Sequence, residues 1–503
     1  MSVWLFSSVN VFADELLIGT ATADITPSLP VALAGQFHLR IANTIETPLT
    51  ASVIALESRN GNRSMDAAIM VSCDLIGIPT VTLKMIRNEV HKQIPELDVS
   101  KIFLNATHPH TGPVLENDLE FTFKYQIPKE GVLQVDEYNA FFVRQIADAI
   151  TKAWKTRVPG SVSWGMSHAA IAYQRRTVYA DGTAVMYGKT DTPEFRNIEG
   201  IADHDVNALL FWNQTGKLIV LTINIPCTAQ EVEGRSAVNA DYIHPVREKL
   251  KQRFGSDLVV LVWIGSAGDQ SPRNLTNGYK AGEPNLWDKP GIIEIGNRLI
   301  KTFDDIYPEE RKSIRTKPVF KHIVEDISLP VRIYTEEEYE QACKLVEEIR
   351  SREPSDQDSP STAWNRFMKE THDNEKIRKF GPWDDKKSDY GILRAQEGVI
   401  ERYKIQEKEP VYNTEIHIIR IDDVALASNP FELFVDYGLR ITGRSEARQV
   451  FIIQLSGDSG GYLPTREAVK GGGYSAIVNR VGPEGGDIFV DKTISIINSL
   501  WSE

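Results

Sequence analysis

Two histidines one residue apart, His108 and His110, are the residues of this chain best suited to chemistry. They follow the apolar run 102–104, which predicts a buried strand that opens into a loop. Side chains at positions i and i+2 of an extended segment point the same way, so both imidazoles would face one cleft. Imidazole is the commonest protein metal ligand and carries protons near neutral pH. The spacing therefore favours a functional site over a histidine that merely bonds a loop carbonyl.

Three further polar loops also follow apolar, strand-like runs. They are 268–272, 429–432 and 457–465. The groups in them that could react or bind a metal are Asp269, Ser271, Glu432 and Tyr462. Loops at strand ends are where α/β folds place their sites. Together with the two histidines, these loops would supply the donors of a hydrolytic metal site.

The segment Gly457–Gly461 also matches the Gly-x-Ser-x-Gly elbow of serine hydrolases. In α/β-hydrolases a histidine must follow the serine, but the last histidine of this chain is His417. The Ala-Ala-His-Cys segment of trypsin-like proteases is missing as well. We therefore interpret the glycines as a tight turn that presents Tyr462.

Composition narrows the class of protein. The 503 residues include 42% hydrophobic and 25% charged residues, as in globular proteins, and the net charge of -13 argues against a nucleic-acid partner. No apolar run reaches transmembrane length, and three cysteines do not form a disulfide framework. Residues 1–13 are apolar and end in Val-Phe-Ala, which resembles the end of a signal peptide although no basic residues precede it. This predicts a periplasmic or secreted protein.

The remaining pattern predicts one mixed-sheet α/β body over 14–503. Strands are expected at 16–18, 51–56, 67–72, 101–104, 206–225 as a hairpin, 258–264, 415–421, 424–428 and 450–455. Helices are expected at 81–93, 137–155 and 241–253, and from Glu432 through Arg440. The stretch 334–409 is strongly charged with helical spacing in 336–350, which predicts a helical insertion on the surface.

Five segments, in this order along the chain, resemble the neutral (non-lysosomal) ceramidase family, specifically its N-terminal catalytic domain. They are 19–27, 106–113, 268–272, 430–432 and 461–465. The resemblance spans roughly residues 18–475 without the insertion. It implies a zinc ion held by His108, Glu432 and Tyr462, with His110 beside the metal as a proton-transfer group. It further implies that Ser271 lies in the site, as the nucleophile or as a hydrogen-bond partner of the reacting carbonyl, and that Arg175 holds an oxyanion or a substrate oxygen.

The chain departs from the family where its second zinc histidine is expected, because residues 224–230 contain none. Cys227 could replace that ligand, since thiolate binds zinc well, or His244 could. Alternatively the metal is lost, or is a harder ion bound by oxygen. The family's C-terminal immunoglobulin-like domain is not recognisable, and the insertion at 334–409 is additional, so the substrate stays open.

Three functions follow from these residues. The first is metal-dependent hydrolysis of an amide or ester, with His110 as the base and Ser271 and Arg175 stabilising the oxyanion. The second is glycoside cleavage, in which Asp269, Glu432 and His110 act as acid and base; Asp269 could equally be only a turn former. The third is a metal-free binding protein. The ligand would be a small molecule, a lipid or a glycan.

Overall fold

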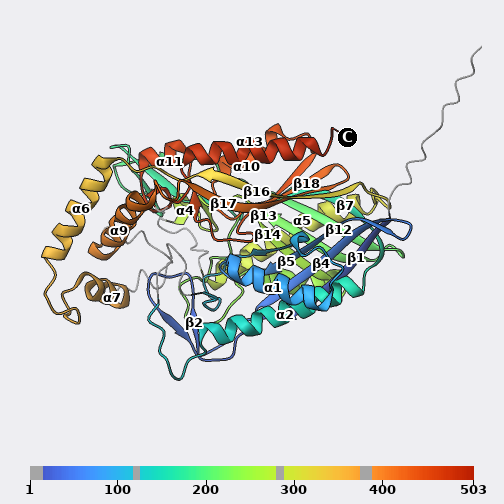
Figure 1. The fold of residues 1–503 in the computed structure, drawn as a ribbon, viewed down its shortest axis with the longest axis horizontal. Coiled ribbons are helices and arrows are strands. Elements are labelled where there is room, and N and C mark those ends of the chain that lie inside the picture. Colours follow the sequence, from blue (N-terminus) through green and yellow to red (C-terminus); the bar gives the residue numbers. More distant parts are fainter. Residues whose placement is uncertain (1–14, 117–124, 279–287, 374–387, 478, 503) are drawn as a thin grey trace, which may run out of the picture.

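The computed structural model describes residues 15–116, 125–278, 288–373, 388–477 and 479–502. Two β-sheets lie face to face, and helices cover the outer face of each (Figure 1). The mixed-sheet α/β prediction is thereby confirmed. The predicted signal segment 1–13 lies outside the described residues.

The larger sheet has eight strands. Across the sheet they are β14 (Val259–Ile264), β13 (Leu218–Ile225), β12 (Asp205–Asn213), β7 (Val158–His168), β1 (Glu15–Asp24), β4 (Thr50–Asn60), β5 (Arg63–Cys73) and β6 (Ile102–Ala106). The outermost pair on each side, β13 with β14 and β5 with β6, is parallel, and the inner pairs are antiparallel. Parallel neighbours need a crossover, and a helix supplies it in both cases.

The second sheet lies over the first. Its strands are β16 (Phe320–Pro330), β17 (Val411–Ile421), β18 (Val424–Ser428) and β20 (Gln449–Ile453). Apolar side chains from both sheets form one core, in which Phe103 and Phe211 of the larger sheet meet Ile419 and Phe451 of the smaller. Strands with apolar neighbours on both faces read as continuous apolar runs, as β14 does.

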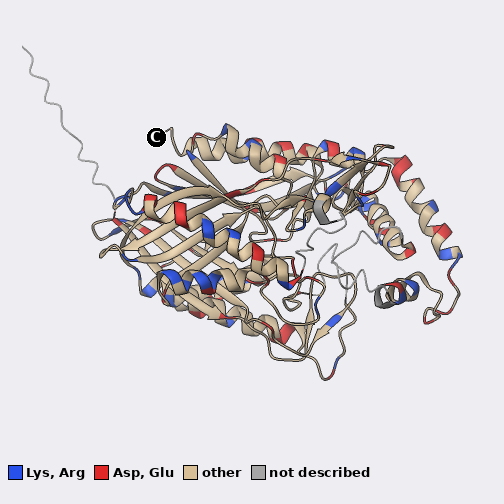
Figure 2. Ribbon diagram, turned by 180° about the vertical axis from the view of Figure 1, so that it is seen from behind, with Lys and Arg blue, Asp and Glu red and all other residues tan. Residues whose placement is uncertain are grey.

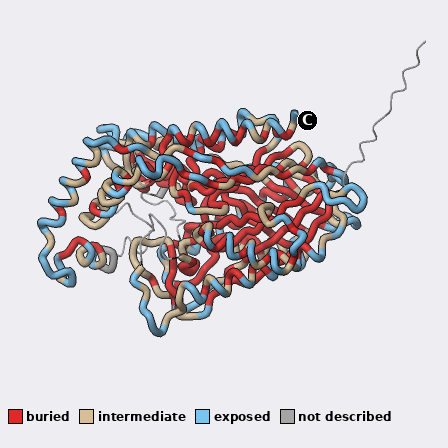
Figure 3. Tube along the Cα trace, viewed as in Figure 1, coloured by how far each residue is buried: buried red, intermediate tan, exposed pale blue. Residues whose placement is uncertain are grey.

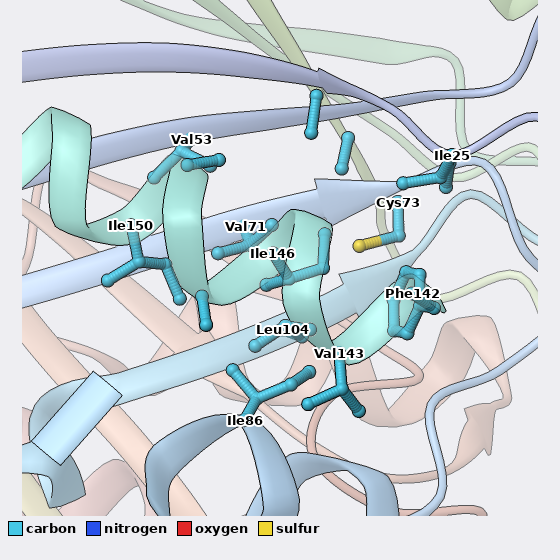
Figure 4. Packing of buried hydrophobic residues seen from close by; sticks show 14 of the residues in the cluster. Ile25, Val53, Val71, Cys73, Ile86, Leu104, Phe142, Val143, Ile146 and Ile150 are labelled. Atoms are coloured by element: carbon cyan, nitrogen blue, oxygen red, sulfur yellow. The ribbon is translucent and has the colours of Figure 1, made fainter. Parts of the chain in front are cut away.

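Six helices complete the layers. On the larger sheet lie α1 (Thr80–Gln93), α2 (Val135–Lys155), α3 (Ile243–Phe254) and α5 (Lys289–Glu310), and on the smaller lie α10 (Val435–Arg444) and α13 (Pro483–Ser499). Figure 4 shows Ile86 of α1 and Phe142 and Ile146 of α2 packed against Val53 and Val71 of the sheet. Burial is accordingly concentrated in the strands and the inward helix faces (Figure 3).

Between residues 334 and 409 the chain forms helices at one end of the body. They are α6 (Glu336–Ser351), α7 (Ala363–Asp373) and α9 (Asp389–Ile405), and they carry charges of both signs (Figures 1 and 2). The ring of Phe367 in α7 lies 6.5 Å from that of Phe37, so these helices contact the body through aromatic side chains. Among the described residues, no helix combines the length and the hydropathy that a membrane span requires.

Candidate active site

The loops that leave the C-terminal ends of β6, β13, β14, β18 and β20 meet at one end of the two sheets. Backbone hydrogen bonds join them: the N–H groups of Gly265, Gln454, Ala229 and Asn429 donate to the carbonyls of Ile225, Ile264, Thr107 and Ile453. Segments that are up to about 350 residues apart in sequence therefore lie together at the edge where these strands end. All of the chemically interesting loops singled out above lie here.

His108 is held in one orientation and one tautomer. Its backbone is in the left-handed region (φ 66°), and its N–H donates to the carbonyl of Leu75 over 3.0 Å. Its ring Nδ1 lies 2.6 Å from the carbonyl oxygen of Ile76. A carbonyl only accepts, so Nδ1 carries the proton and Nε2 presents a lone pair. Burial lowers the pKa of His108 to about 4, which keeps the ring neutral.

The carboxylate of Glu432 and the phenol of Tyr462 lie side by side because two short strands pair in parallel. These are β19 (Glu432–Leu433) and β21 (Tyr462–Leu463), with Glu432 opposite Tyr462. Glu432 Oε2 is 3.6 Å from His108 Nε2 and is buried without a hydrogen bond from the described residues. The structure thus brings an imidazole, an acid and a phenol from three loops into one space.

Arg175 connects the acid and the phenol. Its Nη2 donates to the Tyr462 hydroxyl over 3.3 Å and lies 3.8 Å from Glu432 Oε2. Nη2 also donates to the Gly268 carbonyl over 2.8 Å, and Nη1 donates to the Tyr187 hydroxyl over 3.1 Å. Burial disfavours the charge of Arg175, but these neighbours outweigh it and hold its pKa above the ordinary value. The guanidinium is a fixed cation at the site.

Gly268 is needed where Arg175 and Glu432 approach each other. A Cβ at this position would lie 2.3 Å from the carbonyl oxygen of Glu432, a distance that no side chain tolerates. The Gly268 N–H donates to the Leu433 carbonyl over 2.8 Å. Glycine therefore allows the two backbones to run in contact, which places Glu432 within reach of Arg175.

His110 lies beside His108, with 3.4 Å between the two Nε2 atoms. Two residues from one other loop contact its ring, which the sequence did not predict. Gln230 Nε2 is 2.9 Å from His110 Nε2, and Glu233 Oε2 is 3.0 Å from His110 Nδ1. Burial lowers the pKa of His110 to about 3 and raises that of Glu233 to about 8. Gln230 and Glu233 belong to the loop after β13, where the resemblance led us to expect a histidine.

Ser271 and Asp269 lie on the same loop but contact different residues. Ser271, in the short strand β15 (Gln270–Ser271), is fully buried, its Oγ accepts from the Arg273 N–H over 3.3 Å, and it lies next to Tyr187, a partner of Arg175. Asp269 Oδ2 accepts from Gln174 Nε2 over 2.6 Å, and Oδ1 accepts from the Val435 N–H over 2.9 Å at the start of α10. Burial raises the pKa of Asp269 to about 6. Both oxygens of Asp269 are engaged in joining loops.

The two proposed substitutes for the second zinc histidine make other contacts. Cys227 is fully buried in an apolar cluster, where its thiol donates to the Ile171 carbonyl over 3.2 Å, and burial raises its pKa. His244 is in α3, where Arg247 and Glu248 are its charged neighbours. In the part of the chain that the structure describes, no group of three or more His, Cys, Asp or Glu side chains is arranged to hold a metal. A metal here would therefore depend on the phenol of Tyr462.

Two of the three donors that the resemblance implies have a spacing that suits a metal ion. Zinc bonds of about 2.0–2.2 Å in a tetrahedron place neighbouring donors about 3.3–3.6 Å apart, and His108 Nε2 and Glu432 Oε2 are 3.6 Å apart. The bond from His108 Nδ1 to a backbone carbonyl is the outer contact that metal-bound histidines usually make. Three protein ligands with one open position is the pattern of catalytic rather than structural zinc.

Comparisons with known proteins bear on the fold. No family model matches the chain, and no curated protein does. Among solved structures, the neutral ceramidase from Pseudomonas aeruginosa is similar with a TM-score of 0.65 and 16% identity, over 97% of this chain and 74% of that one. A ceramidase complexed with C2 is similar with a TM-score of 0.66 and 15% identity, over 97% of this chain and 75% of that one. The chain therefore has the fold of the neutral ceramidases.

Proposed function

We propose that the protein is an exported, metal-dependent hydrolase that cleaves an amide or ester bond at this site. The observation that carries the proposal is the unprotonated Nε2 of His108 facing, at 3.6 Å, the buried Oε2 of Glu432, which accepts no hydrogen bond from the described residues. A lone pair and a carboxylate oxygen buried together are both electron-rich, and a cation between them would remove that conflict. Export rests on the sequence of residues 1–13.

His108, Glu432 and Tyr462 would hold the metal, and zinc in such a site polarises a carbonyl and acidifies a bound water. The protein's own groups would do the rest. His110 Nε2 lies beside His108 Nε2, where it would accept a proton from the attacking water and return it to the leaving group. Arg175, fixed by Gly268 and Tyr187, would stabilise the negative charge that develops on the substrate oxygen.

Ser271 would act through Tyr187 or directly on the substrate oxygen, because it lies next to the phenol that Arg175 also contacts. The burial of the site favours this chemistry, since charge–charge interactions are stronger where water is excluded. The glycosidase alternative has weaker support. In the form predicted above, its second carboxyl group is that of Asp269, and both oxygens of Asp269 already accept hydrogen bonds.

The proposal is tested by hydrolysis of short-chain fluorogenic N-acyl amides and acyl esters, alongside synthetic glycosides. We expect cleavage of an amide or ester that a chelator abolishes and added zinc restores, and that falls at least about 100-fold in Glu432→Gln. His91→Ala, an exposed histidine of α1, is the matched control and should keep full activity. Chelator-resistant activity, or activity in Glu432→Gln equal to that of the control, would contradict the proposal.

A further inference from the structure

Glu233 forms the one carboxylate contact of His110 that the structure describes. Its side chain is 1% exposed, and its Oε2 lies 3.0 Å from His110 Nδ1. On the other side of the ring, Gln230 Nε2 lies 2.9 Å from His110 Nε2. Because a neighbour lies within 3.0 Å of each ring nitrogen, turning the imidazole over would give up both the contact with Glu233 and the hydrogen bond with Gln230. The contact with Glu233 is made by Nδ1, whereas Nε2 is the nitrogen that faces His108.

Arg40 holds the backbones of this pair together. It is 4% exposed, its Nη1 donates to the Glu233 carbonyl over 2.7 Å, and its Nη2 donates to the His110 carbonyl. Nη2 also donates to the Ala34 carbonyl over 2.6 Å. One buried guanidinium therefore fixes the spacing between the histidine loop and the loop that carries Glu233. Because Arg40 fixes the backbones of both His110 and Glu233, the two side chains are already in position before a substrate binds.

Gly35 closes the remaining side of the His110 ring. Its φ of +98° lies in the region that favours glycine, and a Cβ built on it would lie 2.4 Å from His110 Cγ. The backbone at position 35 therefore packs directly on the imidazole. Together, Glu233, Gln230 and Gly35 leave the ring a single orientation, with Nε2 directed toward His108.

From these contacts we propose that Glu233 is the positioning residue of His110, holding the imidazole so that Nε2 faces the reacting atoms, with Arg40 fixing the distance between the two loops. In the reaction the proton passes from the attacking water to His110 Nε2 and then to the leaving nitrogen or oxygen, and Glu233 keeps its place at Nδ1 throughout. This role in catalysis rests on the proposed function. The orientation of the ring does not, and it can be measured without any substrate.

The first test is NMR of protein labelled with ¹⁵N at histidine, with the His110 signals assigned from a His110→Gln sample. We expect two well-separated ring-nitrogen signals for His110 in the wild type, the mark of one fixed hydrogen-bonding state. Glu233→Ala should merge or broaden them. Glu233→Gln should keep them apart, because its amide oxygen would still lie next to Nδ1. Glu231→Ala is the matched control, since Glu231 is as buried but bonds to the Asp288 N–H instead.

The second test is kinetic and uses the best amide or ester substrate. We expect Glu233→Ala to lower kcat by about 10–100-fold with KM within about twofold, Glu233→Gln to recover most of the loss, and Glu231→Ala to change neither. His110 signals unaltered in Glu233→Ala would overturn the proposal, and so would a raised KM with kcat intact. If no substrate is cleaved, the proposed hydrolase function is contradicted, but the NMR result still shows whether Glu233 orients His110.

Discussion

The buried ion pair between Arg247 and Asp74 should be among the most costly contacts to break. The two side chains are 1% and 0% exposed. Their bidentate contacts measure 3.0 Å and 3.1 Å. Asp74 also accepts from the Thr50 N–H over 2.9 Å and from the Thr107 hydroxyl over 3.3 Å, next to His108. Arg247→Met leaves this carboxylate buried without its cation, which costs about 3–5 kcal/mol.

Urea unfolding at pH 7, followed by tryptophan fluorescence, measures this loss. The matched control is Arg444→Met, which breaks an exposed 2.8 Å pair with Asp491 and should cost less than about 1 kcal/mol. Adding Asp74→Asn to Arg247→Met should recover part of the stability, because the uncompensated charge is then removed. If Arg247→Met is no less stable than the surface control, the reasoning about burial of this pair is wrong.

Three other outcomes follow from the structure. Cys227→Ala should leave the metal content of purified protein unchanged, because its thiol bonds to the Ile171 carbonyl rather than facing the site; loss of the metal would restore Cys227 as a ligand. Gly35→Ala should lower the melting temperature and the activity together, because its Cβ would meet the His110 ring; an unchanged melting curve would refute this. Burial holds the pKa values of His322 and His417 below the ordinary 6.5. Below about pH 6.5 these histidines bind protons in the unfolded chain and bind fewer in the folded protein. The free energy of unfolding should therefore fall on acidification, by up to about 1.4 kcal/mol per pH unit per histidine. Urea titrations at pH 7, 6 and 5 should show a shallower fall in His322→Gln, and an equal slope would contradict it.

Local sequence patterns were enough to predict several of the buried strands. The apolar run before His108 and the continuous run of β14 are visible in the sequence because both are buried strands that open into polar loops. That Glu432 and Tyr462 lie side by side depends on a two-residue parallel pairing, which no periodicity reveals, and only the resemblance indicated it. The helix expected from Glu432 begins instead at Val435, because Glu432 and Leu433 form β19.

The environment of His110 could not be predicted in the same way. Glu233 is 123 residues away from it in sequence, and its contact depends on how the loop after β13 crosses the histidine loop. Cys227 was a chemically sensible ligand, but the direction of a side chain just beyond a strand end depends on the turn that follows. Asp269 likewise gave no sign that both of its oxygens accept hydrogen bonds from other loops.

The most direct test of the central claim is anomalous diffraction at the zinc absorption edge from crystals of protein purified with zinc. The account predicts one strong peak within bonding distance, about 2.0–2.3 Å, of His108 Nε2, the Glu432 carboxylate and the Tyr462 hydroxyl. A map with no peak among these three groups, or with the peak at Cys227 or His244, would contradict it.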